Sequence, residues 1–305
     1  MRDNCYCCGS TDLKALPKFK EFNHMVCNQC GYENFFNLDF EISSAMYEDD
    51  PDYDNELAFA GNYKNLLQWN HHTATKFLLK NKDQVEKVLD IGTFNGFFVK
   101  HLINYGFDAF GIDFNRKAID FGINNYDLGS RISSENLEKL IDGGKKFDAI
   151  TLFEVIEHIH GDPSEFIYQI SRLLSPNGHL IISTPNSKMI WRPSGDFPPQ
   201  HLSRFTPLAL SKCVEKAKLI KSQSFEQMNS FDLIRNYAGS NLFRSKSDDS
   251  LKGGELKNKA ISNLIRYAAN KLRLFFYFIL SPVDLILYKA NIRYMCQIII
   301  TKLKN

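Results

Sequence analysis

Strand-like and helix-like segments alternate through the middle of this chain of 305 residues. Two parallel strands need a crossover connection between them, and a helix can supply it. The alternation therefore predicts an α/β fold with a doubly wound parallel sheet. The expected strands are 85–91, 109–113, 147–153, 179–184, 219–227 and 295–300, and the expected helices are 63–79, 96–105, 116–126, 164–174 and 206–218.

Cysteines are concentrated at the N-terminus, where five of the seven lie within the first thirty residues. Cys5 and Cys8 are separated by two residues, as are Cys27 and Cys30, and a glycine follows each pair. Two such pairs close on one tetrahedral Zn²⁺ and leave no open position, so the pattern predicts a structural zinc ribbon. Cys7 is the alternative to Cys8 as a ligand, and buried or redox-active thiols are the alternative to zinc.

Composition divides the chain into five parts. We expect the zinc ribbon at 1–33, an acidic linker at 34–62 and the main domain at 63–230. A polar loop with an apolar helical insertion follows at 231–290, and a closing strand of the main domain lies at 291–305. The insertion thus precedes the last strand of the sheet.

An apolar run from Leu274 to Leu280 lies within the insertion. It is too short to span a bilayer, which needs about twenty apolar residues. Flanking Lys and Arg favour peripheral contact with the inner face of a membrane, and a buried helix or a dimer interface fits equally well. The first residues show no secretory signal, so the expected location is the cytoplasm. The oligomeric state is left open.

The balance of charges narrows the class of partner. Lys and Arg number 37 against 35 Asp and Glu, which gives a formal net charge of +2. A dedicated nucleic-acid-binding protein has a stronger basic footprint. A small-molecule or glycan partner is therefore favoured over nucleic acid.

A tight turn joins the first of these strands to the helix after it, in the sequence VLDIGTFNGFF. Asp90, Gly92 and Gly96 lie on this turn, where glycine lets the backbone approach a ligand. The next strand ends at Asp113, which is placed to accept hydrogen bonds from both hydroxyls of a ribose. Phe114 is placed to pack beside an adenine. The turn therefore predicts a nucleoside-containing cofactor.

Four motifs in order, VLDIGTFNGFF, AFGIDFN, KFDAITLFEVIEH and LLSPNGHLIISTPN, resemble the class I S-adenosylmethionine (SAM)-dependent methyltransferases. The resemblance implies a Rossmann-like, seven-stranded sheet with SAM as cofactor. By position, the turn residues named above line its methionine and ribose end, Asp113 holds the ribose hydroxyls, and Glu135 or Asn136 lies near the adenine amine. The family usually has glycine where this chain has Phe94.

Four candidate catalytic residues follow two neighbouring strands. Glu154, Glu157 and His158 come directly after the strand 147–153, and their spacing brings them together if the segment is helical. His201 follows a proline-rich loop after the next strand. Open α/β sheets bind substrates at the carboxyl ends of their strands, so these residues predict the acceptor site.

The sequence EVIEH, followed later by H-x4-T, is similar to the metal site of the small-RNA terminal 2′-O-methyltransferases and to ubiquinone-pathway O-methyltransferases. In the former, two Glu and two His bind a divalent ion that engages adjacent hydroxyls. The likeness implies Mg²⁺ or Mn²⁺ on Glu154, Glu157, His158 and His201. Similar Glu-His segments also occur in this fold without metal, in which case His158 or His201 is the general base.

Together these features predict a SAM-dependent O-methyltransferase acting on a hydroxyl of a sugar, a glycan or another small biosynthetic acceptor. A ribbon before such a domain is similar to bacterial methyltransferases of sugar, polysaccharide and natural-product modification. RNA 2′-O-methylation is an alternative, favoured by the metal-like motif and opposed by the weak net charge. A catalytically inactive binding or scaffolding protein is the other alternative, favoured by Phe94 in the cofactor turn.

Overall fold

The computed structural model describes residues 3–37, 64, 66–189, 192, 196–226, 279–280, 282–286, 289 and 296–303. The chain forms two compact units. One comprises Met1–Ser187, Gly195–Phe225 and Cys296–Asn305, and the other comprises Lys188–Ser194 and Glu226–Met295. The expected acidic linker and most of the expected apolar insertion lie outside the described residues.

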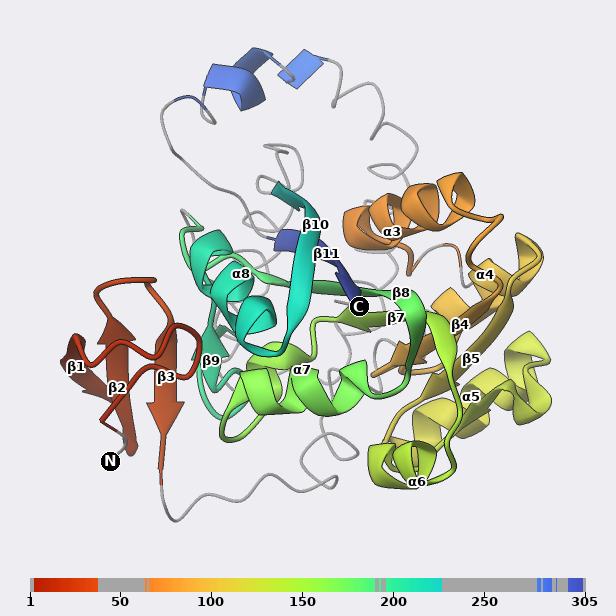
Figure 1. Ribbon diagram of the computed structural model, residues 1–305, viewed down its shortest axis with the longest axis horizontal. Helices are drawn as coiled ribbons and strands as arrows, with labels where there is room; N and C mark the ends of the chain where they lie inside the picture. Colours follow the sequence, from red (N-terminus) through yellow and green to blue (C-terminus); the bar gives the residue numbers. More distant parts are fainter. Residues whose placement is uncertain are drawn as a thin grey trace, which may run out of the picture. The chain divides into compact units, whose positions relative to one another are not determined.

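Within the described residues, the first unit contains a seven-stranded sheet in the order β10-β11-β8-β7-β4-β5-β6 (Figure 1). β4 pairs in parallel with β5 and β7, and β8 pairs in parallel with β7 and antiparallel with β11. The strand order reverses between β4 and β7, which is the position where open α/β sheets bind ligands. The strands are β4 (Lys87–Ile91), β5 (Asp108–Ile112), β6 (Ile132–Ser133), β7 (Phe147–Phe153), β8 (Leu174–Pro185), β10 (Leu219–Glu226) and β11 (Cys296–Leu303).

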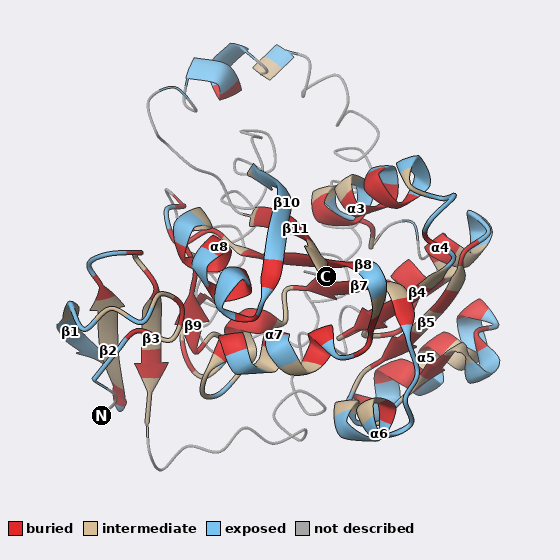
Figure 2. Cartoon of the chain, viewed as in Figure 1, coloured by how far each residue is buried: buried red, intermediate tan, exposed pale blue. Residues whose placement is uncertain are grey.

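Helices cover both faces of this sheet, and alternate residues of the central strands point to opposite faces. Ile150 and Ile182 belong to one buried hydrophobic cluster, which also includes residues of α6 to α8. Ala149 and Ile181 belong to a second cluster with residues of α3 to α5. The central strands are buried along most of their length, whereas β10 at the edge of the sheet is mostly exposed, as Figure 2 shows. The helices are α3 (Trp69–Lys80), α4 (Phe97–Asn104), α5 (Arg116–Tyr126), α6 (Leu137–Asp142), α7 (Pro163–Ser171) and α8 (Pro207–Lys216).

The doubly wound α/β prediction is confirmed, and several of its details are wrong. The helix expected at 164–174 ends at Ser171, and the next strand, expected from residue 179, already begins at Leu174. The first helix was expected from residue 63, but α3 begins at Trp69, because Gln68 adopts an extended conformation and forms a capping box with His71. The short elements β6 and α6 between α5 and β7 were not predicted. A strand of two residues is too short to show a hydrophobic period.

The N-terminal ribbon consists of three antiparallel strands, β1 (Leu13–Phe19), β2 (Phe22–Cys27) and β3 (Glu33–Phe36). β3 continues beyond the boundary expected at residue 33. It also pairs with β9 (Ser203–Arg204), a short strand that precedes α8. The ribbon and the segment before α8 therefore share one sheet.

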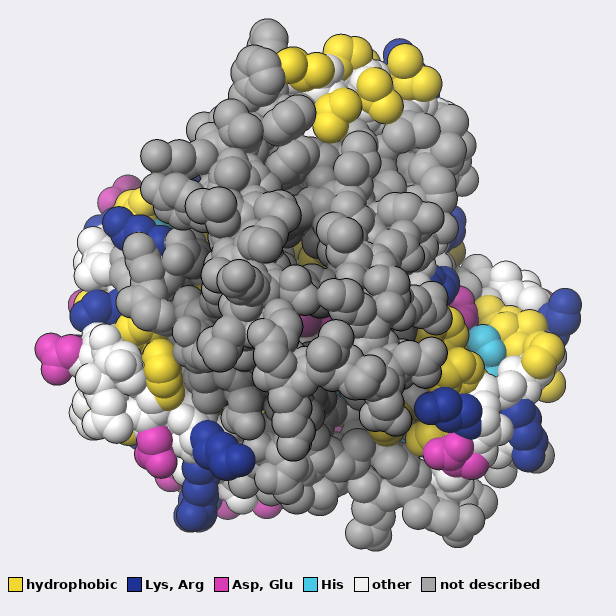
Figure 3. Space-filling view, turned by 180° about the vertical axis from the view of Figure 1, so that it is seen from behind, with side chains coloured by type: hydrophobic (Ala, Val, Ile, Leu, Met, Phe, Trp, Pro, Cys, Tyr) yellow, Lys and Arg dark blue, Asp and Glu magenta, His cyan; other side chains and the backbone are white. Residues whose placement is uncertain are grey.

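A short part of the expected apolar insertion is described, in the second unit. Its side chains Ile279, Val283, Leu285 and Ile286 are exposed and contribute to the hydrophobic group at the top of Figure 3. Among the helices of the described residues, none has the length and apolar character needed to cross a membrane. Contact of this segment with a membrane surface stays a prediction.

Candidate functional site

The turn from β4 to α4 approaches its neighbours too closely for larger side chains. Gly92 and Gly96 have φ angles of 75° and 73°. A Cβ atom at Gly92 would lie 2.3 Å from Cγ2 of Val155, and one at Gly96 would lie 2.5 Å from Cδ1 of Leu128. Both glycines are therefore required by conformation and by packing. The contact with Val155 also places this turn beside the segment that carries Glu157 and His158.

Phe94 occupies the same turn with a φ angle of 54°, a conformation that L-residues adopt at a cost of about 1–2 kcal/mol. We predict that Phe94→Gly is about 1 kcal/mol more stable than Phe94→Ala, because both variants lack the ring and only alanine retains the backbone strain. Urea unfolding of the two variants measures the difference. Equal stabilities would show that the strain at this position is negligible.

Both carboxylate oxygens of Asp113 accept backbone hydrogen bonds, and one of these bonds joins Asp113 to the cofactor turn. Oδ2 accepts a hydrogen bond from the backbone N–H of Phe94 at 2.7 Å, and Oδ1 accepts one from that of Asn115 at 2.8 Å. Each oxygen has a second lone pair, which fits the predicted contact with the ribose hydroxyls of SAM. The next residue, Phe114, is 52% exposed and thus accessible to an adenine ring.

Burial raises the pKa of Asp113 to about 6, against the opposing effect of its backbone hydrogen bonds. Protonation turns a carboxylate oxygen into a donor, so affinity for S-adenosylhomocysteine (SAH) should fall as pH decreases through this value. The expected loss is roughly tenfold one pH unit below the pKa. Calorimetric titrations across this range measure it. Asp113→Asn should bind more weakly and flatten the profile, and an unchanged profile would contradict the assignment of this residue.

The other predicted cofactor residues have different surroundings. Asp90 is 3% exposed and accepts a hydrogen bond from Oγ1 of Thr151 at 2.6 Å, and burial raises its pKa to about 7. Asp90 therefore links β4 to β7 beneath the turn. The side chain of Asn136 caps α6 by accepting from the backbone of Lys139. That oxygen retains a second lone pair, so Asn136 and half-buried Glu135 both stay candidates for the adenine amine.

Glu157, His158 and His201 converge among the described side chains, with one potential ligand atom from each within 4.8 Å of the others. The carboxyl group of Glu157 is fully buried, and its Oε2 accepts a hydrogen bond from Oγ1 of Thr184 at 3.0 Å. Its Oε1 is buried and has no hydrogen-bond partner among the described residues. An unpaired buried oxygen beside two imidazoles is suited to a cation or to a donor on a ligand.

The contacts of the two histidines fix the position of their protons. Nδ1 of His158 lies 2.6 Å from the carbonyl oxygen of Gln200, which can only accept, so this nitrogen donates. Nδ1 of His201 lies 3.1 Å from Oδ1 of Asp196. A carboxylate oxygen also only accepts, so Nδ1 of His201 carries a proton. In the neutral ring the lone pair of His201 therefore lies on Nε2. Burial lowers the pKa of His158 to about 4, so its ring is neutral at physiological pH.

Glu154 does not belong to the converging group. The turn η3 (Ile156–His158) begins after it, and Glu154 itself has a φ angle of 52°. Its carboxyl group accepts hydrogen bonds from Oγ of Ser183 at 2.7 Å and from Sγ of Cys296 at 3.3 Å. Burial raises its pKa. The helical spacing that predicted convergence of Glu154, Glu157 and His158 thus fails at its first residue.

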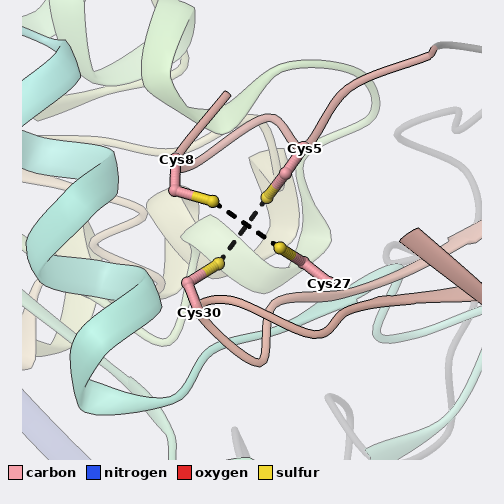
Figure 4. A group of neighbouring side chains, drawn as sticks. All are labelled: Cys5, Cys8, Cys27 and Cys30. Atoms are coloured by element: carbon pink, nitrogen blue, oxygen red, sulfur yellow. Dashed lines mark hydrogen bonds between the residues drawn. The ribbon is translucent and has the colours of Figure 1, made fainter. Parts of the chain in front are cut away.

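The four predicted cysteine ligands point toward one another (Figure 4). Sγ of Cys5 lies 3.6 Å from that of Cys30, and Sγ of Cys8 lies 3.6 Å from that of Cys27. A zinc tetrahedron with Zn–S bonds of about 2.3 Å has edges of about 3.8 Å, whereas bonded sulfurs lie about 2.05 Å apart. The arrangement therefore fits a zinc site rather than disulfides.

Cys7 lies outside this group, among the residues that pack under the ribbon. It is 1% exposed, and burial raises its pKa in the neighbourhood of Cys213 on α8. Cys8 rather than Cys7 thus completes the converging set of four.

Two further residues at the site have no counterpart in the sequence prediction. Asp196 contacts His201, and Arg204 contacts Asp196. Both lie near the proline-rich loop, where no hydrophobic period or known motif draws attention to a charged residue. The only sequence signal for this contact is that Asp196 lies five residues before His201, and this spacing does not by itself indicate that the two side chains meet.

Comparison with known proteins identifies the family. A model of the methyltransferase domain family matches residues 63–219. The chain belongs to this family. The mitochondrial ubiquinone biosynthesis O-methyltransferase of Arabidopsis thaliana is 32% identical over 152 residues, which cover 44% of this chain and 46% of that protein. Its counterpart from Alkalilimnicola ehrlichii is 29% identical over 104 residues, or 33% and 42% of the two chains. The chain therefore spans less than half the length of these curated relatives.

Solved structures agree on the fold. Phosphoethanolamine N-methyltransferase 2 of Haemonchus contortus, in complex with S-adenosyl-L-methionine, has a TM-score of 0.52 and 15% identity, covering 96% of this chain and 71% of that one. The [4+2]-cyclase SpnF has the same TM-score and identity, covering 85% and 94%. The predicted class I methyltransferase fold is thus confirmed. The second neighbour is named as a cyclase, so the fold by itself does not fix the reaction.

Proposed function

We propose that this chain transfers the methyl group of SAM to a hydroxyl oxygen of a small biosynthetic acceptor, with a sugar or glycan hydroxyl as the expected class. The observation that carries the proposal is the convergence of Glu157, His158 and His201 beside the cofactor turn. The names of the sequence relatives support O-methylation as the reaction. They do not address a sugar acceptor, which is inferred from the ribbon that precedes the domain.

The site has residues for both halves of this reaction. Bound SAM supplies an electrophilic methyl group on a sulfonium. Asp113 holds the ribose and Phe114 covers the adenine, which fixes the direction in which the methyl group points. His201, whose neutral ring has its lone pair on Nε2, accepts the proton of the acceptor hydroxyl. The negative charge of Asp196 then stabilises the resulting imidazolium.

A divalent cation is the alternative to His201 as general base, because the Nε2 lone pair of His201 can bind a cation or accept a proton but not both. Glu157 offers an oxygen and the histidines offer nitrogens. Such a mixed set of ligands favours Mn²⁺ over Mg²⁺, which prefers oxygen ligands alone. Such an ion, when bound, would lower the pKa of a coordinated hydroxyl. Four buried or half-buried thiols at the ribbon likewise fit a structural Zn²⁺.

Titration of the metal-stripped protein with SAH, alone and with Mn²⁺, tests the proposal, followed by a screen of hydroxylated acceptors with radiolabelled SAM. We expect saturable binding to one site, and Asp113→Ala should weaken it at least about tenfold because two hydrogen bonds are lost. Asp142→Ala removes an exposed carboxylate and is the matched control. Failure of the wild-type protein to bind SAH would favour the inactive binding or scaffolding alternative. Salt-sensitive methylation of RNA would favour the nucleic-acid alternative.

A further inference from the structure

A continuous series of polar contacts leads from the N-terminal ribbon to His201. Nδ1 of His201 lies 3.1 Å from Oδ1 of Asp196, and Oδ2 of Asp196 lies 3.0 Å from Nε of Arg204. Nη1 of Arg204 in turn lies 3.1 Å from Oε2 of Glu33 on β3. Glu33 belongs to the ribbon, so the series joins two parts of the chain that are distant in sequence.

These contacts are shielded from solvent. The side chains of Asp196 and Arg204 are 2% and 5% exposed. The guanidinium group of Arg204 lies over the rings of Phe35 and Phe197, at 4.8 Å and 4.3 Å from their centroids. Nε of Arg204 also donates to the backbone carbonyl of Asp196 at 3.1 Å, in addition to its ion pair with the carboxylate. Stacking and paired hydrogen bonds of this kind hold an arginine in one orientation.

The backbone reinforces the same connection. The N–H of Phe35 in the ribbon donates to the carbonyl of Leu202 at 2.8 Å, and the N–H of Leu202 donates to the carbonyl of Glu157 at 2.9 Å. Oγ1 of Thr206, which caps α8, donates to the carbonyl of Cys30 in the cysteine cluster. The segment that carries His201 is therefore attached on one side to the ribbon and on the other to Glu157.

We infer that Asp196 is a positioning residue for His201 and that the ribbon, through Glu33 and Arg204, holds Asp196 in place. The inference rests on the proposed function, in which His201 serves the acceptor hydroxyl. A neutral imidazole can present its Nε2 lone pair only if Nδ1 carries the proton, and the carboxylate of Asp196 is the group that requires a proton there. The ribbon is thus part of the acceptor site.

The variant Asp196→Asn gives a sharp test, because Arg204 dictates how the amide must lie. Nε of the cationic Arg204 side chain lies 3.0 Å from the Oδ2 position, where an amide NH₂ would place two donors against each other, so the amide oxygen takes that position and the amide NH₂ faces Nδ1 of His201. Nδ1 then has to accept, and the proton moves to Nε2. Long-range ¹H–¹⁵N spectra of the full chain, labelled with [¹⁵N]histidine and carrying one equivalent of Zn²⁺, report this tautomer at alkaline pH. The variant His201→Gln identifies the resonance.

We expect the Nδ1–H form in the wild-type protein, the Nε2–H form in Asp196→Asn and a mixture of both in Glu33→Gln. Glu215→Gln is the control, since that carboxylate forms an exposed salt bridge with Lys212 and should leave the wild-type tautomer. Retention of the Nδ1–H form in Asp196→Asn would overturn the role of Asp196. A wild-type spectrum from Glu33→Gln would overturn the role of the ribbon.

SAH titration of the same samples separates this inference from the proposed function. We expect each variant to bind SAH within about twofold of wild type, because Asp113 is not part of the series. If the wild-type protein binds no SAH, the proposed function fails, while the tautomer still decides whether Asp196 orients His201. If wild type binds SAH and the tautomer does not respond, the positioning inference alone is overturned.

Discussion

Glu157→Gln should reduce methyl transfer by about 10²- to 10³-fold and leave SAH affinity within about twofold of wild type. The carboxyl group is fully buried, its Oε2 is bonded to Thr184, and its Oε1 has no partner among the described residues, so Oε1 is the oxygen available to a ligand. Burial and the neighbouring Glu154 raise the pKa of Glu157 well above its usual value. Glutamine resembles the neutral acid, so the variant should fold normally while lacking the charge that binds a cation.

Mn²⁺ titration and single-turnover transfer to an acceptor found in the screen measure these effects. Affinity for Mn²⁺ should fall at least about tenfold in Glu157→Gln. The same substitution at Glu165, which is exposed on α7, is the matched control and should change neither quantity. If Glu157→Gln binds Mn²⁺ and transfers methyl groups like wild type, then the converging group is not the acceptor site.

Hydrophobic periodicity predicted the central elements because burial on both faces leaves a clear pattern. The strand at 147–153 and the helix at 116–126 have the predicted bounds. β9 shows no such pattern, because its two residues form a strand only by pairing with β3. Its existence depends on a partner far away in the sequence, which a local pattern does not contain.

The candidate site was predictable where its chemistry follows the ends of strands. Asp113 and Glu157 are such cases, because the topology of a parallel sheet brings those ends to one edge. Glu154 was misplaced because the spacing argument assumed a helix that begins only at Ile156. The contact between Glu33 and Arg204 joins β3 to β9, two strands distant in the sequence, so it arises from packing and was not predictable from the sequence.

Cys27→Ser should remove the bound zinc and unfold the ribbon. A serine hydroxyl is a poor substitute for a thiolate, and a structural Zn²⁺ contributes about 10–16 kcal/mol to the folding of small zinc domains. The ribbon is a small three-stranded sheet with a small hydrophobic cluster, formed by Phe22, Phe35 and Leu202 with Phe19 packed against it. Such a cluster does not compensate for a loss of this size. Metal analysis should give about one zinc per wild-type chain and close to none in the variant.

The damage should extend into the acceptor site and spare the cofactor turn. Without β3, the backbone bond from Phe35 to Leu202 and the ion pair from Glu33 to Arg204 are lost, so amide hydrogen exchange should accelerate across residues 196–206. SAH affinity should remain, because Asp113 bonds to Phe94 and Asn115, and the glycines pack beside Val155 and Leu128 instead. Cys7→Ser is the control, since Cys7 is buried beside the cluster without belonging to it. Normal zinc content in Cys27→Ser, or loss of zinc in Cys7→Ser, would contradict the assigned ligands. Unchanged amide hydrogen exchange at 196–206 in a zinc-free ribbon would show that the acceptor site forms independently of the ribbon.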